Sequence, residues 1–358
     1  MSAPLVVPRG RGAQSNATGR FETQIREAFD DGWTGEDEAP TPLKTHVAPE
    51  RAKTIISRND SPDVGFDRSI NPYRGCEHGC IYCYARPAHA YMGLSPGLDF
   101  ESKLFFKPEA GRLLARELSK PTYTPNTIHI GGNTDPYQPQ ERRLRVTRQV
   151  LEVLDRFHHP FSIITKSALI GRDLDILGPM GRARLARAAV SVTTLDRKLA
   201  RAMEPRAATP EKRLAAIRGL TSVGAPVTVM FAPVIPGLND HELEAVLGRA
   251  AEAGAMAAGY VVLRLPREIK DLFREWLEAA RPDRAKKVMS LVRQMRHGRD
   301  YDMEWGKRMK GDGPIAELLA QRFAAARRKF GLDQVIPALD LTQFRVPPKE
   351  TNQLELFG

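Results

Sequence analysis

The stretch Asn71 to Arg86 reads NPYRGCEHGCIYCYAR and holds every cysteine of the 358-residue chain. Cys76, Cys80 and Cys83 follow one another in the pattern C-x3-C-x2-C. Three thiolates within eight residues can converge on one soft metal centre. A closed structural site normally takes four protein ligands, so a set of three leaves one metal position open. An open position lets a metal bind and activate a small molecule, and the stretch therefore predicts a reactive metal centre.

A structural zinc site is the alternative interpretation of the same stretch. His78 lies between the first two cysteines and would supply the fourth ligand of a closed tetrahedral site. Against this, a Cys-x-His-x-Cys run would be strained if three of its residues were placed tetrahedrally around one ion.

The spacing C-x3-C-x-aromatic-C, with Tyr82 as the aromatic residue, resembles the cluster-binding motif of the radical S-adenosylmethionine (SAM) superfamily. The resemblance implies that the three cysteines hold a [4Fe-4S] cluster and that SAM occupies the fourth iron. It also implies reductive cleavage of SAM to a 5′-deoxyadenosyl radical, which abstracts hydrogen from a substrate. The wider context, GCxHGCxYCYAR, resembles the branch related to spore photoproduct lyase and the DNA repair photolyase-like proteins.

The composition is that of a soluble globular protein, with 42% hydrophobic and 27% charged residues. No apolar run approaches the roughly 18 residues that a membrane span needs. The N-terminus lacks the apolar core of a secretory signal. We therefore expect a cytoplasmic protein whose three cysteines bind metal instead of pairing as disulfides.

The chain is basic, with a net charge of +11 and a pI of about 9.7. Residues 142–218 carry seventeen Lys and Arg against seven acids, whereas residues 22–38 carry seven acids against one Arg. One interpretation is an electropositive sector that faces nucleic acid. The other is that basic residues coat the solvent faces of ordinary helices. The charge alone does not decide between them.

The pattern along the chain predicts an α/β fold in four parts. Residues 1–50 are rich in Gly, Pro, Ser, Thr and charge and are expected to be mostly disordered. Residues 51–266 alternate apolar strands with helices, as parallel βα units do. Residues 267–338 show only helical spacing, and residues 339–358 lose periodicity and form an extended tail.

Six strands are expected in the second part, one of them before the cysteines. The other five are the apolar runs Thr127–Gly131, Phe161–Thr165, Ala189–Thr193, Val227–Phe231 and Gly259–Leu263. Six parallel strands agree with the partial (β/α)6 barrel, similar to a TIM barrel, that the resemblance implies. Helical spacing predicts helices at 141–157, 174–187 and 209–223, and after the barrel at 267–280, 283–296 and 314–330. Another helix should begin at Asn239, with Glu242 completing a capping box.

In parallel βα architectures the functional residues follow the carboxyl ends of the strands. The first candidate group follows the strand around Ile128 and consists of Gly131, Gly132, Asn133 and Thr134. It resembles a variant of the superfamily's Gly-Gly-Glu motif, whose backbone binds the amino group of SAM. Asn133 stands where the acid is expected and Asp135 lies close, so either side chain could act. A plain turn is the alternative.

Further candidate SAM-binding residues lie at the ends of the next strands. The resemblance implies that Lys166 lies near the SAM carboxylate and Ser191 near its ribose, and that Arg206 is a second residue for an anionic group. A partly buried lysine at a strand end requires an anion, and Asp173 is the alternative partner of Lys166. Tyr82 and the segment Ala232 to Asp240 resemble the adenine-contacting parts of the superfamily, although Pro-Gly-x-Asn is also an ordinary turn.

The cysteine count narrows the chemistry. A cluster that uses all three thiols leaves none for an auxiliary cluster or for the hydrogen-donating cysteine of spore photoproduct lyase. We therefore expect a relative of that lyase with another reaction, in which a tyrosine (Tyr84, Tyr91, Tyr137 or Tyr260) takes the place of the cysteine. DNA, a peptide or a small molecule are possible substrates, and a low-potential electron donor is required. A non-catalytic, metal-stabilised nucleic-acid-binding protein is the alternative of a different class.

The last residues carry one more motif. Gln353, Leu354, Leu356 and Phe357 belong to the sequence QLELF, which resembles the pentapeptide that docks bacterial proteins on the DNA sliding clamp. An extended tail can insert two apolar side chains into a pocket while the glutamine forms hydrogen bonds. Alternatively, the apolar tail packs on its own barrel.

Overall fold

The computed structural model describes residues 10–23 and 43–348. Its centre is a seven-stranded sheet in the order β10-β9-β8-β7-β6-β3-β2, in which all neighbours are parallel except the β2–β3 pair at one edge. The strands are β2 (Ile56–Arg58), β3 (Arg68–Ile70), β6 (Ile128–Ile130), β7 (Phe161–Thr165), β8 (Ala186–Ser191), β9 (Val227–Val234) and β10 (Ala257–Val262). The six parallel strands confirm the predicted partial (β/α)6 barrel.

Alternation along each strand divides the sheet into two faces. Ala186, Ala188 and Val190 of β8 are buried in the main apolar core, as are the equivalent positions of the other strands. The residues between them, such as Arg187 and Ala189, are only partly buried and point to the opposite side, which we call the inner face.

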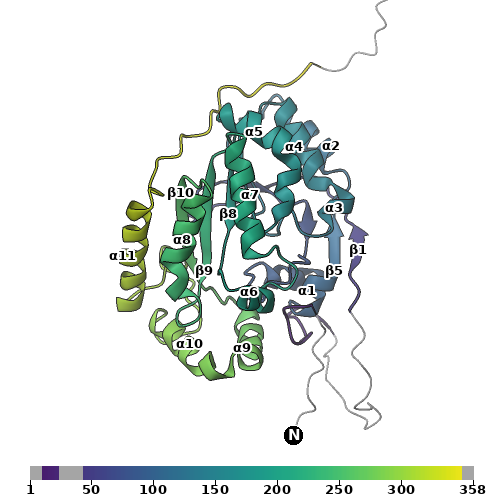
Figure 1. Cartoon of the computed structure of the whole chain (residues 1–358). Helices are drawn as coiled ribbons and strands as arrows, with labels where there is room; N and C mark the ends of the chain where they lie inside the picture. The colour runs from purple at the N-terminus through teal and green to yellow at the C-terminus, as the bar shows by residue number, and fades with distance from the viewer. Residues whose placement is uncertain (1–9, 24–42, 349–358) are drawn as a thin grey trace, which may run out of the picture.

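Helices cover the core side of the sheet (Figure 1). They are α2 (Ala110–Leu118), α3 (Glu141–Leu144), α4 (Val146–Arg156), η2 (Ala168–Asp173), α5 (Leu174–Arg182), α7 (Pro210–Ser222), η3 (Asp240–Glu242) and α8 (Leu243–Glu252). At the start of α7 the Thr209 side chain accepts a hydrogen bond from the Lys212 amide. That contact is the N-cap expected for the helix predicted at 209–223.

Two predicted helices are too long. The helix expected at 141–157 is broken into α3 and α4 at Arg145, whose φ of 53° is left-handed. The helix expected at 174–187 ends at Arg182, and β8 already begins at Ala186. Arg184, with a φ of 59°, makes the turn between them. A left-handed residue ends a helix because it redirects the backbone hydrogen bonds.

The predicted capping box at Asn239 is also wrong. The Asn239 amide is fully buried, accepts a hydrogen bond from the Ile235 amide at 2.6 Å and donates to the Thr193 carbonyl at 2.7 Å. Glu242 binds Thr194 and the Leu195 amide instead of its own helix. The side chains of Asn239 and Glu242 thus join the loop after β9 to the loop after β8. Because they make these tertiary hydrogen bonds, they do not cap the helix.

A small second sheet lies beside the barrel. It has the order β1-β5-β4, with β1 (His46–Pro49) parallel and β4 (Tyr73–Arg74) antiparallel to β5 (Lys103–Phe106). The neighbouring helices are η1 (Arg86–Met92) and α1 (Leu98–Ser102). β1 falls within the segment expected to be mostly disordered, and so do residues 10–23, where Arg11 is 5% exposed. The prediction for residues 1–50 is therefore too broad.

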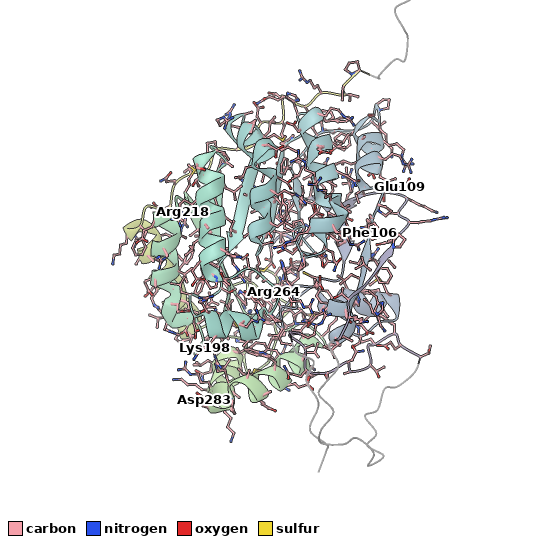
Figure 2. All side chains as sticks on the ribbon, turned by 45° about the vertical axis from the view of Figure 1, so that its right-hand side comes forward. Phe106, Glu109, Lys198, Arg218, Arg264 and Asp283 are labelled. Atoms are coloured by element: carbon pink, nitrogen blue, oxygen red, sulfur yellow. The ribbon has the colours of Figure 1, made fainter. Side chains whose placement is uncertain are left out.

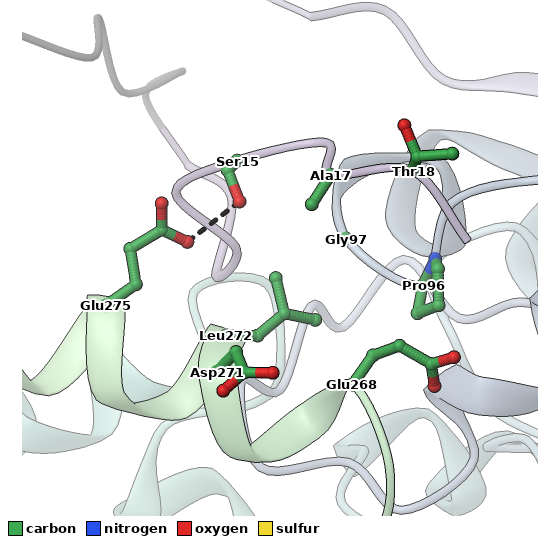
Figure 3. A pocket seen from close by; sticks show the side chains of 9 residues that line it. All are labelled: Ser15, Ala17, Thr18, Pro96, Gly97, Glu268, Asp271, Leu272 and Glu275. Atoms are coloured by element: carbon green, nitrogen blue, oxygen red, sulfur yellow. Dashed lines mark hydrogen bonds between the residues drawn. The ribbon is translucent and has the colours of Figure 1, made fainter. Parts of the chain in front are cut away.

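Residues 10–23 run over the N-terminal part of α9 (Ile269–Ala280) (Figure 3). The Ser15 hydroxyl donates to Glu275, and Arg20 pairs with Glu268 at 2.9 Å. The cavity between this segment and α9 measures about 410 Å³ and is lined by acidic side chains. The contacts fix the N-terminal segment beside the cysteine loop.

The helical extension is confirmed and consists of α9, α10 (Pro282–Gln294) and α11 (Pro314–Lys329). A connection between α10 and α11 spans the open side of the barrel. At one edge the Val262 amide donates to the Met309 carbonyl at 2.8 Å, and at the other edge Arg308 pairs with Asp63. This connection therefore bridges the open side of the barrel.

The described part of the tail, residues 339–348, contains no helix or strand. It crosses the amino ends of the strands, where Phe344 packs against Tyr123, Phe157 and His159. The motif Gln353 to Phe357 lies outside the described residues. None of the described helices is long and apolar enough to cross a membrane.

Candidate active site

The three cysteines lie in the loop after β4, at the carboxyl end of the parallel strands. Cys76 and Cys80 are buried, Cys83 is partly exposed, and none forms a disulfide. Backbone hydrogen bonds hold the loop to its neighbours: the Cys76 amide donates to Phe100, and the Ile81 amide to Met203. The loop is therefore shaped by contacts on both sides and not only by its own turns.

Burial raises the pKa of the Cys76 and Cys80 thiols well above the usual range, and neighbouring thiols and acids add to this effect. Burial likewise raises the pKa of Cys83. Three neighbouring cysteines without a disulfide, two of them buried, are disfavoured as thiolates unless a positive centre compensates their charge. A bound metal centre supplies that charge, so this donor set fits an iron-sulfur cluster.

The zinc alternative required His78 as a ligand. His78 is 2% exposed, and its Nδ1 lies 3.3 Å from Asp135 Oδ2. Within residues 10–23 and 43–348, no three His, Cys, Asp or Glu side chains form a group that could hold a single ion. A cluster spreads its ligands over several irons, so its thiolates need not converge on one point. The position of His78 against Asp135 favours the cluster.

Asp135 connects the ends of two strands. It accepts hydrogen bonds from the Thr165 hydroxyl at 2.6 Å and the Lys166 amide at 2.8 Å. Burial alone would raise the pKa of Asp135, but His78 and these donors together lower it to about 2. Asp135 is thus a structural carboxylate. Asn133 is the exposed side chain of the same turn.

The glycines of this turn make close backbone contacts. Gly131 has a φ of 97°, and a Cβ there would lie 2.8 Å from both the Ile164 carbonyl and Pro136. The Gly132 carbonyl accepts a hydrogen bond from the Tyr84 hydroxyl. The Thr134 hydroxyl donates to the Gly75 carbonyl at 2.9 Å. The predicted SAM-binding turn is therefore joined directly to the cysteine loop.

Lys166 and Ser191 lie side by side. Thr165 is paired with Val190 in the β7–β8 register, so the next residues on each strand occupy one level. The Lys166 ammonium lies 5.7 Å from the centre of the Tyr82 ring. Among the described residues it forms no ion pair with a carboxylate. Both residues thus lie at the carboxyl end of the sheet, on the side of the cysteine loop.

Asp173, the alternative partner of Lys166, is occupied elsewhere. It pairs with Arg172 at 2.8 Å and with Arg148 at 3.3 Å, and it accepts a hydrogen bond from Tyr137. That interpretation of Lys166 is therefore wrong.

Arg206 also has protein partners, contrary to the expectation that it faces an anionic ligand. Its guanidinium binds Glu77 at 2.6 Å and the Gly10 carbonyl at 3.0 Å. Its backbone amide donates to the His78 carbonyl. These contacts make Arg206 a brace of the cysteine loop, because buried Glu77 requires a cation.

Sequence reasoning missed two buried charge networks that hold the loop. Glu204 is 2% exposed and binds the Tyr82 hydroxyl, the Thr193 hydroxyl and Arg213. Of this stretch, the sequence pointed to Arg206 and not to Glu204. The available signal was a glutamate flanked by Met203 and Pro205 at the end of α6 (Arg197–Met203).

The second network is the ion pair between Arg86 and Glu101, at 2.5 Å with both side chains fully buried. Arg86 also donates to the carbonyls of Gly79 and Cys80. Glu101 accepts hydrogen bonds from the amides of Gly12 and Ala13 in the N-terminal segment. Nothing in the sequence indicated which of many arginines would be buried here.

The segment expected to contact adenine lies against the cysteine loop. Ile235 and Leu238 belong to the same buried apolar cluster as Cys80, Ile81 and Tyr82. Four segments that follow four strands therefore meet at one end of the barrel.

The four tyrosines considered as hydrogen donors differ in position. Tyr137 is buried against Asp173, Tyr91 is 67% exposed beside Phe21, and Tyr260 packs on Phe323 at the core side of β10. Tyr84 alone of the four follows a cysteine directly and reaches the Gly131–Thr134 turn through Gly132.

Comparison with known proteins defines the class. The model of the radical SAM superfamily matches residues 70–250, which is half of the chain and contains the three cysteines. The chain belongs to the radical SAM superfamily and is a radical SAM enzyme. An uncharacterized protein of Mycobacterium tuberculosis is 36% identical over 230 residues, which is 64% of this chain and 68% of the relative. An uncharacterized protein of Methanocaldococcus jannaschii is 27% identical over 199 residues, or 56% and 71% of the two chains.

Solved structures show the same fold. A spore photoproduct lyase variant superposes with a TM-score of 0.55 at 15% identity, over 80% of this chain and 79% of its own. Spore photoproduct lyase complexed with a dinucleoside spore photoproduct gives a TM-score of 0.54 at 14% identity, over 79% of each chain.

Proposed function

We propose that Cys76, Cys80 and Cys83 hold a [4Fe-4S] cluster and that SAM binds at its open iron. The observation that carries this proposal is the set of three disulfide-free cysteines, two buried and one partly exposed, at the carboxyl end of the barrel. When bound, the cluster and SAM supply a 5′-deoxyadenosyl radical through one-electron reductive cleavage. The remaining steps depend on side chains of this chain.

Lys166 would bind the SAM carboxylate, since its ammonium has no carboxylate partner among the described residues. Ser191, on the same level of the neighbouring strand, would bind the ribose. The backbone of Gly131 and Gly132 would bind the amino group, with Asn133 and Thr134 in the same turn. Tyr82, held by Glu204, would support the adenine. Together these contacts orient the cofactor over the inner face of the barrel and exclude water from it.

The reaction differs from that of spore photoproduct lyase at the return of hydrogen. The chain has three cysteines, and the cluster uses all of them. Tyr84 is the best placed replacement, because it is adjacent to Cys83 and lies against Gly132. The phenol O–H bond would break, its hydrogen atom would pass to the carbon radical of the product, and the tyrosyl radical left on Tyr84 would be reduced by the low-potential electron donor.

DNA is the substrate that we favour. The net charge of +11 and the basic sector of residues 142–218 support a polyanionic substrate. One similar solved structure carries a dinucleoside photoproduct, which is an observation on that protein only. A peptide or a small molecule would replace DNA if the following experiment excludes it.

The test is incubation of the anaerobically reconstituted and reduced full chain with SAM and DNA, either intact or ultraviolet-irradiated. We expect 5′-deoxyadenosine to form faster in the presence of one of the DNA substrates than in their absence. Equal rates with and without DNA would exclude DNA, whereas no cleavage under any condition would contradict the SAM chemistry.

The SAM chemistry requires one protein partner. Reductive cleavage needs a low-potential electron donor, such as a reduced flavoprotein or ferredoxin, and a reducing cytoplasm suits the three thiols.

The tail motif is the basis for a second partner. It would dock on the sliding clamp of a replicating cell through Gln353, Leu354, Leu356 and Phe357. If purified clamp binds the Leu356→Ala, Phe357→Ala double variant as well as it binds the parent chain, the docking proposal fails.

A further inference from the structure

The inner face of the barrel carries a row of polar side chains that SAM binding does not use. Ser69, His129, Ser162 and Arg187 are paired in register across β3, β6, β7 and β8. Ser162 and Arg187 are each four residues before Lys166 and Ser191 on the same strands. At about 3.3 Å per residue, the row lies about 13 Å from the SAM level.

Arg187 has no partner in this row. Its side chain forms no hydrogen bond or ion pair with any described residue, although the residue is partly buried. None of the inner-facing positions of the six parallel strands is an Asp or a Glu. A cation on a concave, partly enclosed surface without a carboxylate is best satisfied by an anion from outside the chain.

An aromatic pair that includes His129 lies two strands from Arg187 in the same row. The rings of Phe66 and His129 are stacked with centroids 4.2 Å apart and planes within 15° of each other. His129 Nδ1 lies 2.9 Å from the Ser162 hydroxyl. Burial, with a smaller contribution from Arg187, lowers the pKa of His129 to about 4, so the imidazole is neutral at pH 7. A neutral stacked pair can support a planar ring next to the cationic group.

We propose that Phe66, His129, Ser162 and Arg187 form a nucleotide subsite, in which Arg187 binds a phosphate and the stacked pair contacts the base. This inference rests on the proposed function and assigns the part of the substrate that enters the barrel. The subsite and the SAM level lie about 13 Å apart along the strands. A nucleotide held with its phosphate at Arg187 and its base at the stacked pair would present its sugar toward the cofactor.

The test measures equilibrium binding to the reconstituted full chain by calorimetry, with thymidine and thymidine 5′-monophosphate as probes. A pyrimidine is chosen because an adenosine would also enter the SAM site. Arg187→Gln should weaken binding of the monophosphate by 10- to 100-fold and leave thymidine binding within twofold. Phe66→Leu should weaken both probes by the same factor, and Arg187→Lys should restore part of the monophosphate affinity.

Arg218→Gln is the matched control, because Arg218 is exposed on the outer helical layer, away from the inner face (Figure 2). This variant should bind both probes as the parent chain does. Equal monophosphate affinity in the Arg187→Gln variant and the parent would overturn the subsite, and so would a parent chain that binds neither probe. Iron, sulfide and SAM cleavage are measured on the same preparations, so loss of the cluster chemistry is recorded separately from loss of the subsite.

Discussion

The basic residues around the cysteine loop and those on the inner face of the barrel have opposite surroundings. Arg86, Arg206 and Arg213 around the loop each meet a buried glutamate. Lys166 and Arg187 on the inner face meet no carboxylate among the described residues. We infer from this difference that the paired cations shape the loop, whereas the cations without a carboxylate partner bind ligands. The following predictions test this division, from the largest effect to the smallest.

Arg86→Leu should have the largest effect, because it leaves the Glu101 carboxylate buried without a cation. Removing one partner of a buried pair costs about 3–5 kcal/mol of unfolding free energy. Urea unfolding of the anaerobic protein measures this loss. The double variant Arg86→Leu, Glu101→Leu should recover part of the loss, since two apolar residues need no partner. A single variant as stable as the parent would show that this pair does not hold the loop.

The buried histidines should make the fold sensitive to acid. Burial lowers the pKa of His159, which is fully buried, to about 4. Because the folded-state value lies below the unfolded value of about 6.5, stability is full above pH 6.5 and declines as the pH falls toward 4, by up to about 3 kcal/mol for this group.

Urea unfolding at pH 7.5 and pH 5 measures this decline. His159→Gln should reduce the difference between the two pH values, and His46→Gln, at an exposed position of β1, is the control. An unchanged difference in the His159→Gln variant would contradict the assignment.

Lys166→Met should weaken the binding of SAM and leave the free energy of unfolding unchanged. Loss of a charge-assisted hydrogen bond of about 1.5–3 kcal/mol corresponds to a roughly 10- to 150-fold weaker SAM affinity. Equilibrium binding of SAM to the reconstituted protein measures it, and Lys198→Met, at an exposed position of α6 (Arg197–Met203), is the control. Unchanged SAM affinity would remove Lys166 from the ligand-binding set.

Tyr84→Phe should have the smallest effect on the fold. It removes one hydrogen bond to the Gly132 carbonyl, worth about 0.5–1.5 kcal/mol. Product formation should fall while SAM cleavage continues, if the phenol returns hydrogen. Full product yield from the phenylalanine variant would exclude Tyr84 as the donor.

The repeating parts of the fold could be predicted from the sequence. The strand Phe161–Thr165 was predicted with its observed bounds, and the helices at 283–296 and 314–330 within two residues at each end. These segments follow one periodicity without interruption. The predicted helix bounds are wrong where a single residue ends a helix. Arg145 and Arg184 do so through a left-handed backbone that no sequence pattern indicated.

The motifs of the candidate site could be predicted from the sequence, but the ion-pair partners of its charged residues could not. The cysteine spacing and the order of the strand ends indicated where the site lies. Whether an arginine faces a glutamate or an inner face without carboxylates depends on contacts between residues far apart in sequence. Arg206 and Arg187 differ in this respect, because Glu77 is 129 positions from Arg206 and yet binds it at 2.6 Å.

The central claim is that three cysteines hold a cluster, and iron and sulfide analysis after anaerobic reconstitution tests it most directly. The parent chain and the His78→Asn variant should each retain a [4Fe-4S] cluster, with its charge-transfer absorbance and SAM cleavage. Cys76→Ala, Cys80→Ala and Cys83→Ala should each lose iron, sulfide and cleavage together. If the cysteine variants keep all three, or if the parent binds a single zinc ion that His78→Asn abolishes, the account is contradicted.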